Sequence, residues 1–350
     1  MREPKRVLIY DVANVLFRVA AVQKYSPYAR DASEEDMVGL CMHMALYSIY
    51  KWFEKYRPEF VVFAFEGSNN WRKKYTAETY ARKAFQYKGN RVIDPAMKHY
   101  YQLIDSFRET IKAHTSICCL HIDTMECDDA IAGYCQLNAQ DGKEIFIVSG
   151  DRDFVQLLKL PGVKLVNPDD GKLRNQPGDK HYQPDIDYWL FEKCVRGDMG
   201  DYVPSAYPRV RATKIREAYQ SEYARINFMN TIWTETLDDG KTVAHRVGDL
   251  FEHNVLLLDL YKQPTEVRTA LLQAVQEQSQ TLGHYSHFHF LRFLDKHRLE
   301  KVRENAVRFV DMFTNNQRFL KGEQILQTTK PPVREAEDSK PAPRAGLLEF

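Results

Sequence analysis

Carboxylate side chains follow four stretches of the sequence that are typical of buried β-strands. These stretches are residues 7–10, 60–65, 116–122 and 145–148, and each is mostly apolar. In an open parallel sheet, ligands bind outside the carboxyl ends of the strands, so we expect the acids that follow to converge on one place. The acids at or just beyond these strand ends, with a pair in a later Gly-rich turn, are Asp11, Glu66, Asp123, Glu126, Asp128, Asp129, Asp151, Asp153, Asp198 and Asp201.

The chemistry of such a set is metal binding. Crowded carboxylates repel one another unless a cation lies among them. The set offers only oxygen ligands, with no His or Cys at matching positions, and this suits Mg²⁺ or Mn²⁺ better than Zn²⁺. Many hard oxygen ligands with room for two ions are the arrangement of two-metal phosphoryl transfer. The pattern therefore predicts two Mg²⁺ ions, for which Mn²⁺ can substitute.

Helix capping is the alternative explanation for any single acid in this set. An Asp after a strand is often the N-cap of the next helix, and Asp153, Asp128 or Asp129 could each have that role. Capping requires one acid per helix, however. It does not account for Asp151 together with Asp153, and the convergence of the whole set is the functional signal.

The elements that position these acids follow from the pattern of the chain. Its first half alternates strand-like and helix-like segments, which is typical of an α/β domain with a mainly parallel sheet. A capping box at residues 33–36 predicts a helix that ends before Pro58, and Asp94-Pro95 predicts another helix start. From about residue 184 amphipathic helices replace the strands. We therefore predict an α/β core over residues 1–183, a helical lobe over 184–325 and a flexible tail over 326–350.

Composition excludes several protein classes. The formal net charge is +1, so charge alone does not indicate a partner. The first residues lack the apolar core of a signal peptide, and no apolar run is long enough to cross a bilayer. The six cysteines show no zinc-finger spacing with His, which favours reduced thiols in a cytoplasmic protein.

An insertion at about residues 68–93 is basic and aromatic. Between positions 71 and 91 it holds seven Lys or Arg residues interleaved with aromatic ones, and Glu78 is its only acid. Cations follow a phosphate backbone and aromatic faces stack on unpaired bases, so this composition suits single-stranded nucleic acid. A solvated amphipathic helix that packs on the body is the alternative. We favour the nucleic-acid interpretation because the insertion adjoins the carboxylate set.

An ordered series of motifs resembles the flap endonuclease / 5′-nuclease superfamily, and most of all its T-even phage ribonuclease H branch. The resemblance covers roughly residues 7–205. The motifs that carry it are Asp11, Phe65-Glu66 with Trp71-Arg72, Tyr87-Lys88-Gly89-Asn90-Arg91, Glu126-Cys127-Asp128-Asp129, Ser149-Gly150-Asp151-Arg152-Asp153 and Gly197-Asp198-Met199-Gly200-Asp201. The resemblance implies a PIN-like α/β nuclease core with a helical arch over the active site. It implies Mg²⁺-dependent 5′→3′ cleavage of RNA primers on DNA (ribonuclease H activity) and of 5′ flaps during DNA replication. It also implies a monomer that acts in the cytoplasm, which would be the host cytoplasm if the enzyme is encoded by a bacteriophage.

The resemblance also implies roles for single residues. The ligands of the first metal would be Asp11, Glu66, Glu126, Asp128 and Asp151. The second metal would be held by Asp153, Asp198 and Asp201, with Asp129 near or between the two. In the arch, Lys88 matches a lysine that steadies the scissile phosphate, Arg91 its companion, Tyr87 an aromatic that supports the end base, and Arg72 the arginine at the arch start. The other residues expected to bind nucleic acid are Lys73, Lys74, Arg209, Arg211, Lys214 and Arg216.

Two departures from the family pattern stand out. Position 66 is Glu where the family usually has Asp, which extends the carboxylate by one methylene. The segment after Asp201 lacks the family's Gly-x-Gly loop, so we expect no bound potassium ion and assign duplex contact to the basic residues there. A haloacid-dehalogenase-type phosphatase would need a second Asp where this chain has Ala13. A nuclease-like DNA-binding scaffold without activity is the stronger alternative, and Glu66 is its only support.

The chain ends in an apolar peptide on a Pro-rich, charged tether. The apolar residues are Leu347, Leu348 and Phe350. A frayed end is one explanation and a docking motif is the other. The resemblance implies a sliding clamp or a single-stranded-DNA-binding protein as the partner, and we favour the clamp slightly.

Overall fold

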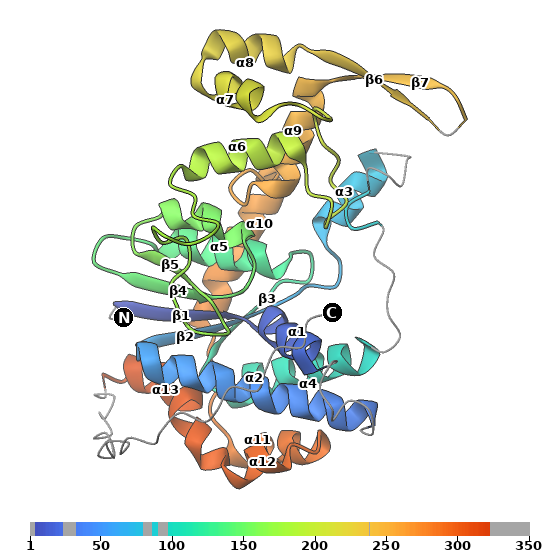
Figure 1. Ribbon diagram of the computed structural model, residues 1–350. Coiled ribbons are helices and arrows are strands. Elements are labelled where there is room, and N and C mark those ends of the chain that lie inside the picture. Colours follow the sequence, from blue (N-terminus) through green and yellow to red (C-terminus); the bar gives the residue numbers. More distant parts are fainter. Residues whose placement is uncertain (1–3, 24–32, 80–85, 90–96, 238, 323–350) are drawn as a thin grey trace, which may run out of the picture.

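A five-stranded parallel sheet lies at the centre of the protein (Figure 1). The structure is a computed structural model, and it describes residues 4–23, 33–79, 86–89, 97–237 and 239–322. Its strands are β1 (Arg6–Asp11), β2 (Phe60–Phe65), β3 (Cys118–His121), β4 (Glu144–Val148) and β5 (Val163–Val166), in the order β3-β2-β1-β4-β5. Every neighbouring pair is parallel, so the predicted α/β class with a mainly parallel sheet is confirmed.

Helices cover both faces of the sheet (Figure 1). One face carries α1 (Val12–Gln23), α2 (Glu34–Tyr56), α4 (Lys98–His114), α11 (His287–Lys296), α12 (Glu300–Glu304), η5 (Ala306–Phe309) and α13 (Val310–Leu320). The other face carries α5 (Cys127–Asn138), the 3₁₀ helix η4 (Asp153–Lys159) and α10 (Thr265–Gln280). The strands are apolar on both faces because both are buried, which is typical of parallel sheets.

Residues 184–325, which we predicted to form one helical lobe, lie in two places. The helices α6 (Ile186–Arg196), α7 (Ala212–Gln220), α8 (Glu222–Met229) and α9 (Val247–Leu258), with the hairpin β6 (Ile232–Thr236) and β7 (Thr242–Arg246), extend away from the sheet on the α5 side (Figure 1). Helices α10–α13 return to the sheet. Their apolar side chains complete its two hydrophobic cores, so the α/β core is not confined to residues 1–183.

The end of the described chain is bonded to the middle of the sheet. In α13, the Asn316 amide accepts a hydrogen bond from the Val61 backbone N–H (2.7 Å) and donates one to the Val61 carbonyl (2.8 Å). The neighbouring Asn315 donates to the carbonyl of Glu59 (3.1 Å). These side chains satisfy backbone groups of β2 on the side that faces β3, because the pairing of β2 with β3 begins only at Val62.

Local signals in the sequence explain several element ends. Ser33 is the N-cap of α2 and accepts from the Asp36 N–H, as the capping box predicted, and the helix ends at Tyr56 before Pro58. The insertion begins with α3 (Trp71–Thr79). The rest of the predicted arch is described only at residues 86–89, and Arg91 and the predicted tail peptide of Leu347, Leu348 and Phe350 lie outside the described residues. No helix in the described ranges is long and apolar enough to span a membrane.

Candidate active site at the carboxyl ends of the strands

The predicted acids meet at one edge of the sheet. Asp11 ends β1, Glu66 follows β2 directly, and Asp151 follows β4, which is paired with β1. Hydrogen bonds join these strand ends: the Ser149 hydroxyl donates to Asp11 (3.0 Å), and the Cys127 N–H donates to Glu66 (3.0 Å). The parallel topology therefore brings the acids together, because all carboxyl ends of the strands lie on the same side.

Electrostatic strain marks this group of acids. Burial raises the pKa of Asp11 to about 6, and the charge of Asp151 adds to the shift. Burial and the neighbouring Glu126 raise the pKa of Glu66 to about 7. Asp128 has a pKa well above its usual range for the same two reasons. The site therefore holds more negative charge than its own cations neutralise, and a bound cation would relieve that excess.

The arch residues Tyr87 and Lys88 lie among these acids. The Tyr87 hydroxyl lies within hydrogen-bond distance of Glu126 (2.8 Å) and of Asp201 (2.9 Å), so its one hydrogen can be donated to either carboxylate, and its ring is buried. The Lys88 ammonium pairs with Glu126 and lies 3.7 Å from Asp201. The Lys88 backbone, at a positive φ of 53°, also donates to the carbonyl of Asp201 (2.8 Å). These contacts join the insertion to the loop that carries the last predicted acids.

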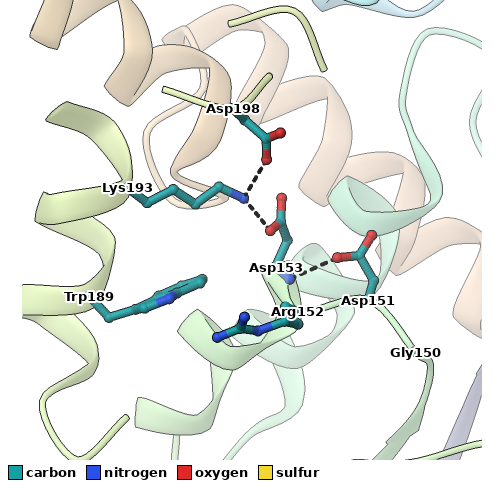
Figure 2. A pocket seen from close by; sticks show the side chains of 7 residues that line it. All are labelled: Gly150, Asp151, Arg152, Asp153, Trp189, Lys193 and Asp198. Atoms are coloured by element: carbon teal, nitrogen blue, oxygen red, sulfur yellow. Dashed lines mark hydrogen bonds and ion pairs between the residues drawn. The ribbon is translucent and has the colours of Figure 1, made fainter. Parts of the chain in front are cut away.

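Lys193 lies among the acids that we predicted to hold the second metal, as Lys88 lies among the acids predicted to hold the first. Its ammonium pairs with Asp153 and lies 3.1 Å from Asp198 (Figure 2). Burial raises the pKa of Asp153, although Lys193 acts in the opposite direction. Our sequence reasoning missed Lys193, because a single lysine on an amphipathic helix carries no distinguishing pattern. Its spacing of five residues before Asp198 was the only available signal.

Arg72 and Asp129 form a buried ion pair beside the site. The Arg72 guanidinium makes two hydrogen bonds to Asp129 (2.6 and 2.8 Å) and one to Glu126 (3.3 Å), and it donates to the carbonyl of Leu257 (2.8 Å). Both side chains are at most 1% exposed. Two predicted roles need correction. Arg72 is not available to nucleic acid, because its donors are used inside the protein. The Asp129 oxygens also accept from Trp71 (3.1 Å) and Gln263 (3.0 Å), so donors inside the protein occupy this carboxylate and it is not free to bind a metal ion.

Capping also explains part of the acidic motif in α5. Glu126 is the N-cap residue of this helix and forms a capping box with Asp129. The Glu126 backbone N–H donates to Asp129 (3.3 Å). The capping alternative therefore applies to this pair, whereas Asp128 takes no part in that box and keeps its raised pKa.

The donor set suits a hard divalent cation in its chemistry. The candidate ligands are carboxylates, and they repel one another. Among the described residues, however, no group of three or more His, Cys, Asp or Glu side chains is arranged to hold a metal ion. The ammonium groups of Lys88 and Lys193 lie between the carboxylates that such a group would need. The two lysines thus neutralise part of the charge that cations would otherwise balance.

The other predicted nucleic-acid-binding residues lie on the surface. Lys73 and Lys74 are exposed on α3, and Lys74 forms a weak pair with Glu78 at 3.9 Å. Arg209, Arg211, Lys214 and Arg216 are exposed at the start of α7 and in the loop before it. Their charges are available to a polyanion, in contrast to that of Arg72.

Comparisons with known proteins point to a nuclease fold. A family model described as the 5′-3′ exonuclease, N-terminal resolvase-like domain matches residues 6–184. No curated protein matches the sequence significantly. A structure of the T5 5′-exonuclease with divalent metal ions (zinc) is 17% identical with a TM-score of 0.54, and covers 79% of this chain and 100% of its own. Another T5 protein structure, co-crystallised with metal ions, is 14% identical with a TM-score of 0.53 and the same coverage. These likenesses show that the two proteins share the fold of this chain.

Proposed function

Because the chain belongs to the 5′-3′ exonuclease family and is therefore a 5′ nuclease, we propose that it removes RNA primers and 5′ flaps during DNA replication by metal-dependent hydrolysis. The observation that carries the proposal is the meeting of Asp11, Glu66 and Asp151 at one sheet edge. Burial and mutual repulsion raise the pKa values of the first two, and such perturbation clusters at functional sites.

The proposed metal ligands divide into two groups. Asp11, Glu66, Glu126, Asp128 and Asp151 would hold one Mg²⁺, and Asp153, Asp198 and Asp201 a second. Bound divalent cations would place positive charge against the phosphate oxygens and make water more acidic, which is their usual contribution to hydrolysis. These ligands would be in position before the substrate arrives, because the strands that carry them, β1, β2 and β4, are held in register.

The two buried lysines would act on the phosphate that enters the site. Lys88 pairs with Glu126 in the first group, and Lys193 pairs with Asp153 in the second. An ammonium held at the scissile phosphate stabilises charge that develops in the transition state more than charge already present in the substrate. The exposed Lys73 and Lys74, by contrast, would attract the strand before it reaches the site.

A cleavage assay tests the proposal directly. The purified protein is incubated with a 5′-labelled flap and with an RNA–DNA hybrid, each with Mg²⁺ and with EDTA. We expect products with 5′-phosphate and 3′-hydroxyl ends in Mg²⁺ only. Asp153→Asn should abolish cleavage while the circular-dichroism spectrum stays unchanged.

The alternative function is a nuclease-like scaffold that binds DNA without cutting it. Glu66 in place of the usual Asp is the observation that favours it, together with the lysines among the ligands. Binding of the flap without cleavage in Mg²⁺ or Mn²⁺ would support the scaffold. Full cleavage in EDTA, or by the Asp153→Asn protein, would exclude the metal-dependent mechanism.

A further inference from the structure

A cavity of about 480 Å³ lies next to the second group of acids (Figure 2). Its volume falls within the range that small-molecule sites occupy in proteins. Four of the side chains that line it belong to the acidic site already described, namely Asp151, Asp153, Asp198 and Lys193. The other two side chains, Arg152 and Trp189, have no role in the proposed metal chemistry, and Gly150 completes the wall.

Arg152 forms no ion pair with any side chain that the structure describes. It lies between Asp151 and Asp153 in the sequence, yet within the described parts of the chain it has neither an ion pair nor a hydrogen bond from its side chain, and it is exposed. The two flanking acids bond elsewhere: Asp151 accepts from the Asp153 N–H (2.8 Å), and Asp153 pairs with Lys193. A free guanidinium at the wall of a cavity fits a phosphate, because its planar fork of donors matches the phosphate oxygens.

Trp189 supplies an aromatic surface in the same cavity. It lies one turn before Lys193 on α6, and the Lys193 ammonium is 5.8 Å from the centre of its ring. The indole is half-buried: part of it packs against two apolar clusters, and the rest lines the cavity. Figure 2 shows the Arg152 guanidinium turned toward the Trp189 side, away from Asp198. A large aromatic surface left open in a polar cavity suits a nucleobase, because every base has a face that can stack.

We propose that this cavity binds one unpaired nucleotide next to the scissile phosphate, with its base stacked on Trp189 and its phosphate held by Arg152. The inference rests on the proposed nuclease function. It assigns substrate recognition to two residues outside the acid set, and it adds the requirement that the nucleotide at this position carries a base. A packing role for Trp189 is the alternative, and any large apolar side chain would then serve.

An abasic scan of the substrate distinguishes the two. A series of 5′-labelled flaps carries one abasic nucleotide at each position around the cut, and each flap is cleaved by wild type, Trp189→Phe, Trp189→Leu and Arg152→Gln. At one position we expect base removal to lower the kcat/KM of wild type by about 5- to 150-fold, which corresponds to the usual strength of one base–aromatic stack. Trp189→Leu should be slow on every flap and insensitive to base removal at that position. Trp189→Phe should recover most of the sensitivity.

Arg152→Gln should weaken binding of the flap. It should also reduce the slope of log affinity against log salt concentration by about one unit, as expected for the loss of one phosphate contact. Arg196→Gln is the matched control, because Arg196 is exposed at the end of α6, the helix that carries Trp189, and pairs with Glu192 (2.7 Å). The stacking proposal is wrong if no position shows base dependence that changes with residue 189, or if Trp189→Leu cleaves like wild type.

A fluorescence measurement separates this proposal from the nuclease function. We expect a thymidine decanucleotide in Ca²⁺ to quench the tryptophan emission of wild type, and the quenching to be smaller in Trp189→Phe. If the oligonucleotide quenches the emission of wild type but the protein cleaves no substrate, the proposed nuclease function is wrong and the proposed nucleotide subsite still stands. Cleavage with equal quenching in both proteins would overturn the subsite and leave the nuclease.

Discussion

Removing the Arg72 guanidinium should destabilise the fold more than any other single loss of a charged side chain near the site. In Arg72→Met, Asp129 stays fully buried and loses two of its hydrogen bonds (2.6 and 2.8 Å), and the Leu257 carbonyl loses its donor. Loss of one partner from a buried ion pair typically costs about 3–5 kcal/mol. Since domains are typically stable by about 5–15 kcal/mol, we expect a large fall in the free energy of unfolding.

Urea denaturation followed by circular dichroism measures this loss. The control is Lys74→Met, which breaks the exposed pair with Glu78 (3.9 Å) on the same helix and should cost less than about 1 kcal/mol. Arg72→Lys keeps the charge but loses the two-pronged geometry, and we expect an intermediate loss. If Arg72→Met were no less stable than the Lys74 control, the buried pair would not be holding α3 to α5 and our reasoning would fail.

The same variants test the corrected role of Arg72 on DNA. A residue that contacts a phosphate contributes about one unit to the slope of log affinity against log salt concentration. Because the Arg72 donors are used inside the protein, Arg72→Lys should leave that slope unchanged. Lys73→Ala should reduce it, because Lys73 is exposed on the same helix. A reduced slope for Arg72→Lys would restore the original assignment.

Three other perturbations follow from the structure. Lys88→Ala should lower the rate of the chemical step much more than substrate affinity, measured by single-turnover kinetics, and an effect on affinity alone would show that we misassigned its role. Burial lowers the pKa of His253 from 6.5 to about 4, so the neutral ring's contribution to stability is complete above pH 6.5 and is lost as the pH falls through 4. As the pH falls from 7 to 5, protonation of this single group should lower the free energy of unfolding by about 2 kcal/mol. In urea titrations, His253→Phe should lose less stability over that pH range than wild type does. The control is His181→Phe at an exposed position, which should lose as much as wild type. Deletion of residues 340–350 should leave cleavage of short free flaps unchanged and reduce stimulation by a sliding clamp or a single-stranded-DNA-binding protein; loss of cleavage without any partner would contradict the docking interpretation.

The convergence of the acids could be predicted from the sequence because it depends on topology alone. Once residues 7–10, 60–65 and 145–148 are recognised as parallel strands, Asp11, Glu66 and Asp151 must share an edge. The family motifs then supply their proposed roles. Topology did not predict the positions of Tyr87 and Lys88, whose proposed roles came from the family resemblance alone; in the structure both side chains contact Glu126.

The fate of individual charges could not be predicted, because it depends on partners that are distant in the sequence. Arg72 is buried by Asp129, 57 positions away, and by Leu257, 185 positions away. Nothing in the basic run around Arg72 separates it from the exposed Lys73. The return of α13 to the sheet likewise depends on two asparagine side chains, Asn315 and Asn316, whose polar character alone would place them in solvent.

The bond between Asn316 and Val61 has a consequence for the order in which the protein can be made. The two residues are 255 positions apart, so β2 leaves the ribosome long before its partner exists. Until α13 is synthesised, the apolar face that Phe309 and Phe313 cover stays open, and a nascent chain that already carries every proposed catalytic acid has no finished core to hold them. Contacts of this separation slow folding, because a long loop must close before they stabilise anything. We therefore expect that the sheet edge that carries the acids gains its full support only after α13 has been synthesised and has packed on β2.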